Sequence, residues 1–435
     1  MGFLRSSYDD EMIWIAGTVV NLNPTASVYL GCGTGTKVEP SQISDNIEAN
    51  ILVLKSYDQS KKIVVISVDT LFLGNYVSRT LVSRLGGAFS PDEIFLAATH
   101  SHTAPMVDET KPNLGIVNKE YTLLLLDRIV SATLDLMTKP FVLAHINSWE
   151  PSLGGIVSRR SKRIFDVSRN GLRFQPVLQR PNFRNYARRL PANVVEFVDE
   201  EGFTLATLAV IPCHPVAFQG LDFVSADIAG AIRLGFRNIT EKSKQTPFIF
   251  LQGASGDLNP WWKRGWLSGG LLNLVDQFVN GPTFPVFTQQ AMSSWSSKRL
   301  KELVSKKPKR KGIVPSPRDA GFGSSLLQVP LSHILESAVD KDQRFFTVHT
   351  IEIGDLRFVG VSAEVTWEFK KEILSLLEGG ILVGCIRDSF GYVSSSKQYR
   401  EGGYEASGHQ SSFSISHFEN LPPAMAVSSL VSKTT

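Results

Sequence analysis

The sequence predicts an α/β fold with a central, mostly buried sheet and flanking helices. Short runs rich in Val, Ile, Leu and Phe are typical of strands that are buried on both faces. Helical patterns lie between several of these runs, which favours alternating strands and helices. Of the 435 residues, 43% are hydrophobic and 20% are charged. These are globular proportions, so long disorder and collagen-like structure are excluded.

The expected elements follow one another along the chain in a clear order. Apolar runs predict strands at 63–68, 94–98, 205–211, 248–251 and 356–361. Helical patterns predict helices at 121–137, 226–237 and 367–377. The first helix has the clearest limits, because an acidic residue precedes it and Lys139-Pro140 ends it.

Two stretches of the chain look irregular. Residues 158–189 are rich in Arg, Asn and Ser, and residues 265–323 are rich in Pro, Gly and Ser. We expect both to be insertions or lids on the sheet. The sequence therefore predicts one catalytic domain over residues 1–435, with insertions at about 158–189 and 265–323.

The positive net charge comes from one short segment. Residues 298–311 hold eight basic residues and one acidic residue, a local charge of +7, which leaves −3 for the rest of a chain whose total is +4. We interpret this segment as a solvated surface loop. A patch for nucleic acid or an anionic membrane is the alternative, but the segment lacks interleaved aromatic residues. We expect no nucleic-acid partner.

The sequence favours a cytoplasmic protein without a membrane span. Its three cysteines, Cys32, Cys213 and Cys385, argue against an extracellular disulfide framework. No apolar run approaches the ~20 residues of a membrane span, and the N-terminus lacks an apolar leader with a cleavage site. A trimmed secreted form is the alternative, and the sequence does not indicate an oligomeric state.

Polar residues follow each of the five predicted strands. Because ligands bind beyond the carboxyl ends of strands in α/β sheets, these residues predict a polar site at that edge. The residues are Asp69, His100 with His102, His214, Asp257 with Asn259, and Glu364.

His100 and His102 are separated by one residue, and residues i and i+2 of an extended strand face the same side. Two metal ligands fit this spacing, and so do one ligand and one general acid–base. With a distant His and a carboxylate, the set has the N and O donors that catalytic Zn²⁺ uses, and water bound to such a metal is a nucleophile near neutral pH. Cys213 directly precedes His214, and we expect it to be a small buried hydrophobe.

Several ordered segments resemble the neutral/alkaline (non-lysosomal) ceramidase family. No single motif is decisive, but the segments occur in one order over residues ~60–405. They are THSHTAP at 99–105, CHPV at 213–216, SAD at 225–227, LQGASGD at 251–257, IGD at 353–355 followed by AE at 363–364, and GY at 391–392 followed by GGYE at 402–405.

This resemblance implies a zinc amidase with its metal at the sheet edge. The metal ligands that it implies are His100, His214, Glu364 and Tyr392. It places His102 beside the reacting amide as a catalytic group and Tyr404 as a hydrogen-bond donor to the oxyanion. It also implies an arginine in the same pocket, for which Arg159 is our choice and Arg160 the alternative.

The chain departs from the family at two places. Asn259 stands where ceramidases have Ser, and a carboxamide can donate a hydrogen bond but cannot act as a nucleophile. We expect Asn259 to act in the catalytic site, with Asp257 and Trp261 contacting the substrate. Only 30 residues follow Glu405, too few for the C-terminal β-sandwich of larger members. We therefore expect a compact relative that acts on something other than membrane ceramide.

The sequence thus favours a zinc-dependent hydrolase that cleaves the amide bond of an N-acyl amine through metal-activated water. The substrate would be a small-molecule or lipid-like amide, with a role in lipid metabolism. One alternative keeps the metal but cleaves an ester, lactone or cyclic amide, or catalyses a ring-forming or transfer step. A second, minor alternative is a non-catalytic binding protein on the same scaffold.

Overall fold

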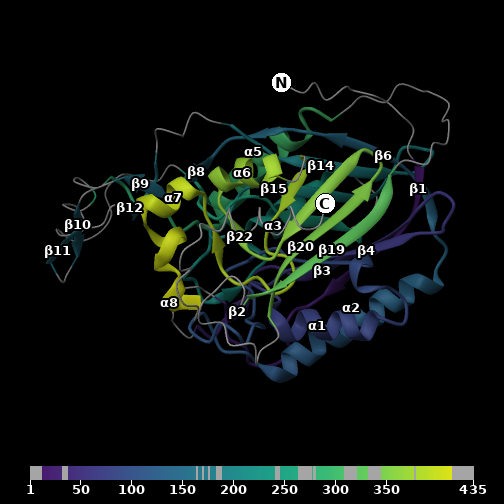
Figure 1. The fold of residues 1–435 in the computed structure, drawn as a ribbon, viewed down its shortest axis with the longest axis horizontal. Helices are drawn as coiled ribbons and strands as arrows, with labels where there is room; N and C mark the ends of the chain where they lie inside the picture. Colours follow the sequence, from purple (N-terminus) through teal and green to yellow (C-terminus); the bar gives the residue numbers. More distant parts are fainter. Residues whose placement is uncertain are drawn as a thin grey trace.

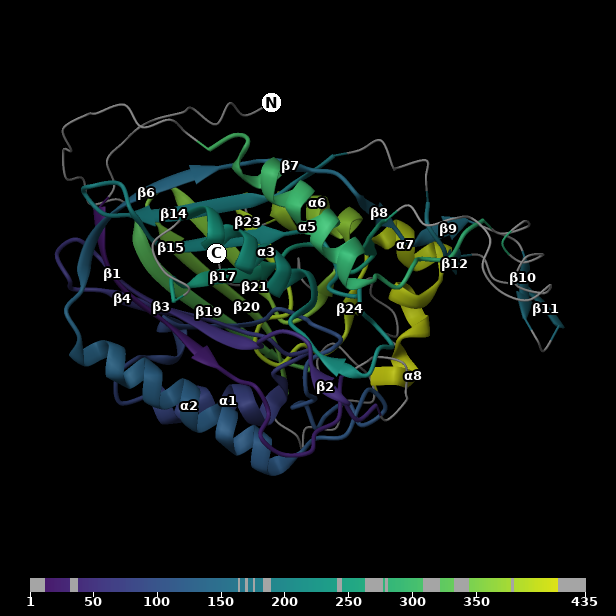
Figure 2. The same ribbon diagram turned by 180° about the vertical axis from the view of Figure 1, so that it is seen from behind.

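Four layers of secondary structure build the molecule, as Figure 1 and the opposite view in Figure 2 show. They are a layer of helices, an eight-stranded sheet, a four-stranded sheet and one further helix. The computed structural model describes residues 12–31, 38–162, 165–168, 171–174, 177–182, 189–240, 245–262, 277, 281–307, 321–331, 344–376 and 379–413.

The eight-stranded sheet confirms four of the predicted strands. Its order is β17 (Phe248–Gln252), β15 (Thr204–Ile211), β14 (Asn193–Val198), β6 (Val142–Trp149), β1 (Met12–Asn21), β3 (Glu48–Lys55), β4 (Lys62–Val68) and β5 (Ile94–Ala98). The pairs β4–β5 and β15–β17 are parallel, and the other ladders are antiparallel. Both faces are covered, so even the antiparallel strands β3 and β4 read as continuous apolar runs.

Four of the described helices cover one face of this sheet. They are α1 (Gly74–Leu85), α2 (Lys119–Thr138), α3 (Asp227–Thr240) and α5 (Gln289–Val304). Helices α1 and α2 pack on β3, β4 and β5, whereas α3 and α5 pack on β14, β15 and β17. The predicted helix at 121–137 is confirmed, although it begins two residues earlier, where the Asn118 side chain caps it, and it ends just before Lys139 as expected.

A four-stranded sheet covers the opposite face. Its order is β19 (Phe322–Pro330), β20 (Phe345–Ile353), β21 (Leu356–Val361) and β23 (Ile381–Val383). The predicted strand at 356–361 therefore lies in this second sheet and not beside the other four. Helix α6 (Trp367–Leu376) closes the outer side, with Phe369 and Ile373 packed on Val359 and Val361.

Short elements link the layers and frame one end of the molecule. Strand β8 (Ile156–Ser158) pairs with β18 (Leu258–Pro260), and β22 (Glu364–Val365) pairs with β24 (Tyr392–Val393). Residues 158–189 include the paired strands β10 (Phe165–Ser168) and β11 (Gly171–Phe174), which extend from the body in Figure 1. The remaining short elements are β2 (Gln42–Ile43), β7 (Ser152–Leu153), β9 (Arg160–Lys162), β12 (Val177–Gln179), β13 (Leu190–Pro191), β16 (Phe223–Val224), a 3₁₀ turn at Pro91–Glu93, α7 (Ser396–Glu401), a π-helical turn at Tyr404–Gly408 and α8 (Gln410–Phe413).

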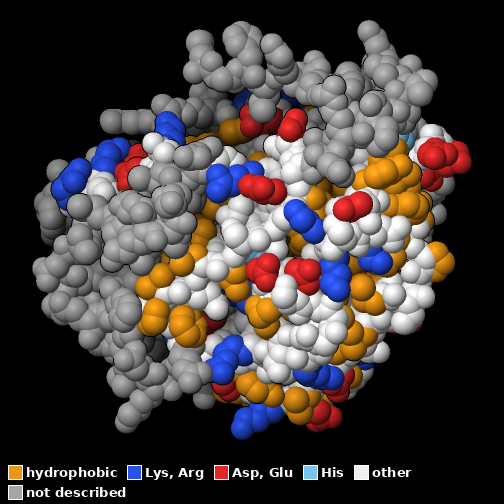
Figure 3. Space-filling model, turned by 45° about the vertical axis from the view of Figure 1, so that its right-hand side comes forward, with side chains coloured by type: hydrophobic (Ala, Val, Ile, Leu, Met, Phe, Trp, Pro, Cys, Tyr) orange, Lys and Arg blue, Asp and Glu red, His pale blue; other side chains and the backbone are white. Residues whose placement is uncertain are grey.

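The basic segment at 298–311 is only partly a solvated loop. Its first residues continue α5, and Arg299 is buried and forms an ion pair with Glu302. Lys307 Nζ lies 2.8 Å from Oε1 of the buried Glu196, and residues 308–311 lie outside the described part of the chain. On the face shown in Figure 3, acidic and basic side chains are interspersed.

The structure also bears on the expectations for the cysteines and for membrane-spanning helices. Cys213 and Cys385 are buried and unpaired, as expected for Cys213, whereas Cys32 lies outside the described residues. Among the helices that the structure describes, none has the length and apolar character needed to cross a membrane.

Candidate metal centre

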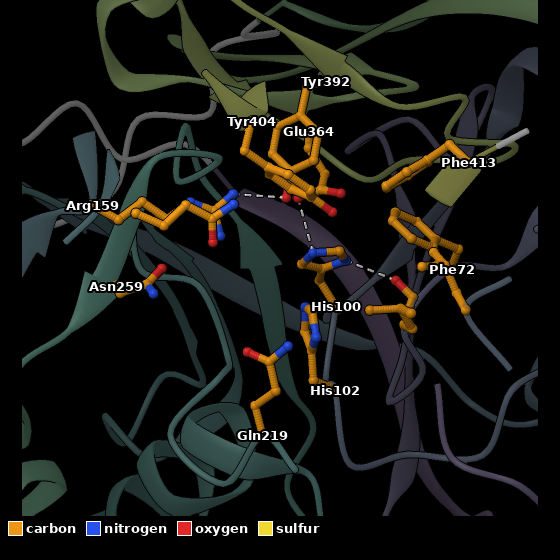
Figure 4. A pocket seen from close by; sticks show the side chains of 13 residues that line it. Phe72, His100, His102, Arg159, Gln219, Asn259, Glu364, Tyr392, Tyr404 and Phe413 are labelled. Atoms are coloured by element: carbon orange, nitrogen blue, oxygen red, sulfur yellow. Dashed lines mark hydrogen bonds and ion pairs between the residues drawn. The ribbon is translucent and has the colours of Figure 1, made fainter. Parts of the chain in front are cut away.

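Two imidazoles and one carboxylate from distant segments meet at one buried point, and Figure 4 shows two of these three groups, His100 and Glu364. His100 Nε2 lies 3.1 Å from His214 Nε2 and 3.1 Å from Glu364 Oε2. His214 Nε2 lies 3.7 Å from the same carboxylate oxygen. His102 Nε2 lies 3.2 Å from His214 Nε2. All four side chains are buried.

The backbone at His100 explains how the HxH pair addresses one point. His100 has φ +68°, in the left-handed region that residues other than glycine rarely adopt. The pair therefore lies in a sharp loop after β5, and the extended i, i+2 geometry expected from the sequence is wrong. The two rings are still close, with centroids 5.0 Å apart and planes at 86°.

Backbone carbonyls fix how the two ligand-type imidazoles are oriented. His100 Nδ1 lies 2.9 Å from the carbonyl oxygen of Leu71, and His214 Nδ1 lies 3.3 Å from that of Ser255. A carbonyl only accepts, so both Nδ1 atoms carry the proton and donate it. In the neutral rings, both Nε2 lone pairs then face the common point, which is the arrangement that metal-binding histidines use.

Strand pairing places Glu364 beside Tyr392. These two residues are register partners in the parallel pair β22–β24. The Tyr392 hydroxyl accepts a hydrogen bond from Arg159 Nη2 at 3.0 Å. Burial raises the pKa of Tyr392 well above its usual value, although the nearby Arg159 guanidinium opposes this shift.

The donor atoms fit a metal ion. Glu364 Oε2 is buried and accepts no directed hydrogen bond among the described residues. Bonds of ~2.0–2.1 Å to a tetrahedral Zn²⁺ place neighbouring donors about 3.3–3.4 Å apart, close to the separations here. The ligand atoms of His100, His102 and His214 all lie within 4.8 Å of one another, so this group could hold a metal ion.

The pKa shifts show that the cluster favours a positive charge. Burial lowers the pKa of His100, but the Glu364 carboxylate and the Cys385 side chain together raise it by more, and the net pKa is well above its usual value. Burial lowers the pKa of His214 well below its usual value, and the charge on His100 lowers it further. One positive charge beside Glu364 is therefore favoured and a second is not.

The Glu405 carboxylate binds both candidate arginines, one with each of its oxygen atoms. Arg159 Nε donates to Glu405 Oε1 at 2.6 Å, and Arg160 Nη1 donates to Glu405 Oε2 at 2.7 Å. Arg159 continues to Tyr392, whereas Arg160 continues to the Gly402 carbonyl oxygen. Burial raises the pKa of Glu405, but the two guanidinium groups lower it by more, so it stays charged. Of the two arginines, Arg159 is the one that reaches the centre.

A cavity of about 200 Å³ lies against the donor cluster. Of the residues predicted to be catalytic, His102, Tyr404, Arg159 and Asn259 line it. Tyr404 begins the π-helical turn, a rare element that often occurs at functional sites. The predicted ligands His100, Glu364 and Tyr392 also line the cavity, whereas His214 lies behind it.

The structure does not bring Asp257 and Trp261 into this cavity. Asp257 accepts hydrogen bonds from the Trp367 backbone N–H at the start of α6, at 2.8 Å, and from Gln398 Nε2, at 3.1 Å. The Trp261 ring packs against Phe284, with centroids 5.9 Å apart. Asp69 likewise follows a strand but pairs with Arg233 at 2.7 Å. The position of a polar residue directly after a strand therefore does not by itself place its side chain in the site.

Several residues at the site, most of which line the cavity, escaped the sequence analysis. Gln219 lies five residues after His214, so proximity to that motif was an available signal. Glu405 belongs to the GGYE segment and received no role there. The apolar lining residues carry no sequence signal, because loops and a C-terminal helix bring them together. They are Leu71, Phe72, Leu114 and Phe413.

Comparisons with known proteins give the fold. The crystal structure of neutral ceramidase from Pseudomonas aeruginosa matches with a TM-score of 0.70 and 14% identity, over 97% of this chain and 74% of that chain. A structure of ceramidase complexed with C2 matches with a TM-score of 0.70 and 13% identity, over the same shares. No family model matches the sequence, and the curated proteins give no significant match. The predicted likeness to neutral ceramidases is confirmed at the level of the fold.

Proposed function

We propose that this protein is a zinc-dependent hydrolase that cleaves the amide bond of an N-acyl amine. One observation carries the proposal: the Nε2 atoms of His100 and His214 and the Oε2 atom of Glu364 face one another in a buried cluster. The neutral ceramidase fold supports the reaction class. The fold match extends over 97% of the chain, and we propose residues 1–435 as one catalytic domain.

His100, His214 and Glu364 would hold the metal, with Tyr392 as the fourth ligand. When bound, Zn²⁺ acts as a Lewis acid and lowers the pKa of a bound water molecule. His102 lies beside this point and is the group that would carry a proton to the leaving amine. Tyr404 and Arg159 line the same cavity and would hydrogen-bond the carbonyl oxygen as negative charge develops on it.

Asn259 is the observation that favours a second candidate. It lines the cavity and offers no nucleophile, so the reaction depends entirely on activated water. Such a centre can also attack an ester, lactone or cyclic amide. Comparison of matched N-acyl amines, esters and lactones separates the candidates, because faster turnover of lactones than of linear amides would favour the second.

Metal analysis and hydrolysis together test the main proposal. We expect purified protein to contain about one zinc per chain and to hydrolyse short N-acyl amines, with both properties lost after chelation or in His214→Ala. His145→Ala is the matched control, since His145 lies on β6 away from the cavity lining. Zinc-free protein that cannot be loaded, or full activity in His214→Ala, would contradict the proposal.

A further inference from the structure

A cluster of four aromatic rings borders the cavity, and one of its members has no part in the proposed function. Tyr392, Tyr404 and Phe413 line the cavity and are labelled in Figure 4. The fourth member is His409, whose ring centroid lies 5.1 Å from that of Tyr392, 6.2 Å from that of Tyr404 and 5.5 Å from that of Phe413. His409 is buried and does not line the cavity. Any effect of His409 on a bound molecule must therefore pass through its neighbours.

Two groups of His409 bind the same backbone atom of Tyr404. The backbone N–H of His409 donates to the Tyr404 carbonyl oxygen at 2.9 Å, which closes the π-helical turn. His409 Nδ1 lies 3.0 Å from the same oxygen. A carbonyl only accepts, so Nδ1 carries the proton and donates it. The side chain therefore adds a second hydrogen bond at the point where the turn closes on Tyr404.

The segments on either side of Tyr404 differ in how firmly they are held. The glycines at 402–403 precede it with positive φ values of +72° and +99°, which glycine adopts without steric cost. Glu405 follows it and is fixed by its ion pairs with the two arginines. The later part of the turn, residues 407–408, is exposed. His409 therefore ties the exposed part of the turn back to Tyr404.

Packing alone does not require a histidine at this position. The His409 Nε2 atom is buried and has no hydrogen-bond partner among the residues that the structure describes. An unsatisfied buried polar atom destabilises a folded chain, and a phenylalanine ring would pack against the same neighbours without this cost. The contribution that distinguishes histidine from phenylalanine here is the hydrogen bond from Nδ1 to Tyr404.

Resting on the proposed function, we infer that His409 is a positioning residue that acts through Tyr404. Its Nδ1–H group holds the Tyr404 backbone and so keeps the Tyr404 hydroxyl in place to donate to the substrate carbonyl oxygen. A hydrogen-bond donor stabilises developing negative charge best when it is fixed in place before the reaction. His409 then affects turnover, whereas substrate binding and zinc binding do not depend on it.

Three variants separate the hydrogen bond from the packing. His409→Asn keeps an N–H donor at the position of Nδ1, His409→Gln carries the same group one bond further along, and His409→Phe keeps a ring without a donor. Because a misplacement of about 1 Å can cost about a hundredfold in rate, we expect kcat to fall at least about thirtyfold in His409→Phe and His409→Gln. His409→Asn should stay within about fivefold of the wild type, since its amide replaces the donor. The p-nitroanilide of butyric acid serves as the substrate, and KM should change less than about threefold in each variant.

A double variant shows whether His409 acts through Tyr404. Tyr404→Phe removes the hydroxyl, so the addition of His409→Phe should lower kcat by less than about twofold more. A full additional loss would mean that His409 acts by another route and would overturn the inference. Loss of zinc in His409→Phe would overturn it as well, because the ring also contacts Tyr392.

Fluorine NMR measures how firmly Tyr404 is held without any turnover. The chain has nine tyrosines, so full-length protein labelled with meta-fluorotyrosine gives few signals, and Tyr404→Phe identifies the signal of Tyr404. We expect a single narrow signal in the wild type and in His409→Asn, and a broadened or split signal in His409→Phe and His409→Gln. An equally narrow Tyr404 signal in every variant would overturn the inference.

The two kinds of measurement separate this inference from the proposed function. If the amide is cleaved but neither kcat nor the Tyr404 signal responds to His409→Phe, the proposed function stands and the inference falls. If the signal responds but no amide is cleaved by any of the proteins, the hold of His409 on Tyr404 stands and the proposed function falls.

Discussion

Two cavities of nearly equal volume flank the Arg159–Glu405–Arg160 cluster. The first, of about 200 Å³, holds the donor cluster and is lined by Arg159. The second, of about 190 Å³, is lined by Arg160 and by the buried Asp257. Both combine buried acids, arginine and aromatic residues. Size and polarity alone therefore do not tell which of them is the functional site.

The two cavities differ in how their buried acids are satisfied. In the second cavity, Asp257 accepts hydrogen bonds from Trp367 and Gln398 and so links α6 to α7. In the first, the Glu364 Oε2 atom faces two imidazole nitrogens and accepts no directed hydrogen bond from the residues that the structure describes. A satisfied buried acid stabilises structure, whereas acceptors that face one another require a cation. This difference supports the proposal that the first cavity carries the chemistry and that Asp257 has a structural role.

Of the three changes, Glu364→Gln should lower zinc binding and activity the most. It therefore tests the difference between the two cavities most directly. The change keeps the shape of the side chain but removes the negative charge that the imidazoles face. We expect at least a hundredfold weaker zinc binding and at least a thousandfold lower kcat/KM. Zinc titration and amide hydrolysis measure these effects. Asp257→Asn is the control in the second cavity, and equal zinc loss in both variants would break the comparison.

Arg159→Lys should have an intermediate effect. Lysine cannot donate to Glu405 and to the Tyr392 hydroxyl with one rigid fork. We expect kcat/KM to fall about a hundredfold while the zinc content stays unchanged. Arg160→Lys is the matched change on the side of the second cavity, and there we expect less than a tenfold loss. Equal losses in the two variants would show that both arginines act only through Glu405.

Asp257→Asn should have the smallest effect on activity and a distinct effect on stability. Burial raises the pKa of Asp257 to about 6, from 3.8. The stability that this residue contributes is therefore complete below pH 3.8 and is lost as the pH rises through 6, because the unfolded chain releases the proton first.

Asparagine does not titrate, so the variant should gain about 2 kcal/mol relative to the wild type between pH 4.5 and pH 7.5. Urea unfolding of both proteins at the two pH values measures this gain. Zinc content and kcat/KM should stay within about tenfold of the wild type. A stability difference that does not change with pH would contradict the shifted pKa of Asp257.

Much of the fold was predictable because burial leaves a clear pattern in the sequence. The strands β4, β5, β15 and β17 and the helix α2 appear as apolar runs and a capped helical pattern. The partners of each strand were not predictable. An apolar run reports that both faces are buried, and a second sheet buries a strand as effectively as a helix does.

The site was predictable where short motifs carry ligand-type residues. His100, His214 and Glu364 do meet, and Tyr392 lies beside Glu364. Asp257 shared the same strand-end signal, but the backbone after β17 turns its carboxylate towards α6. The left-handed backbone of His100 also has no sequence signal, since it depends on the surrounding tertiary contacts.

The short ladder between β22 and β24 limits which insertions and deletions this protein can tolerate. Glu364 and Tyr392 are aligned by backbone pairing, and a slip of one residue turns a side chain to the opposite face of a ladder. Changes in the length of the 27 residues between them must therefore be absorbed in turns, such as that around Gly379 and Gly380, which both have positive φ. Substitutions are less restricted, because main-chain atoms set the register. An alignment held in this way can persist while almost every neighbouring side chain is exchanged.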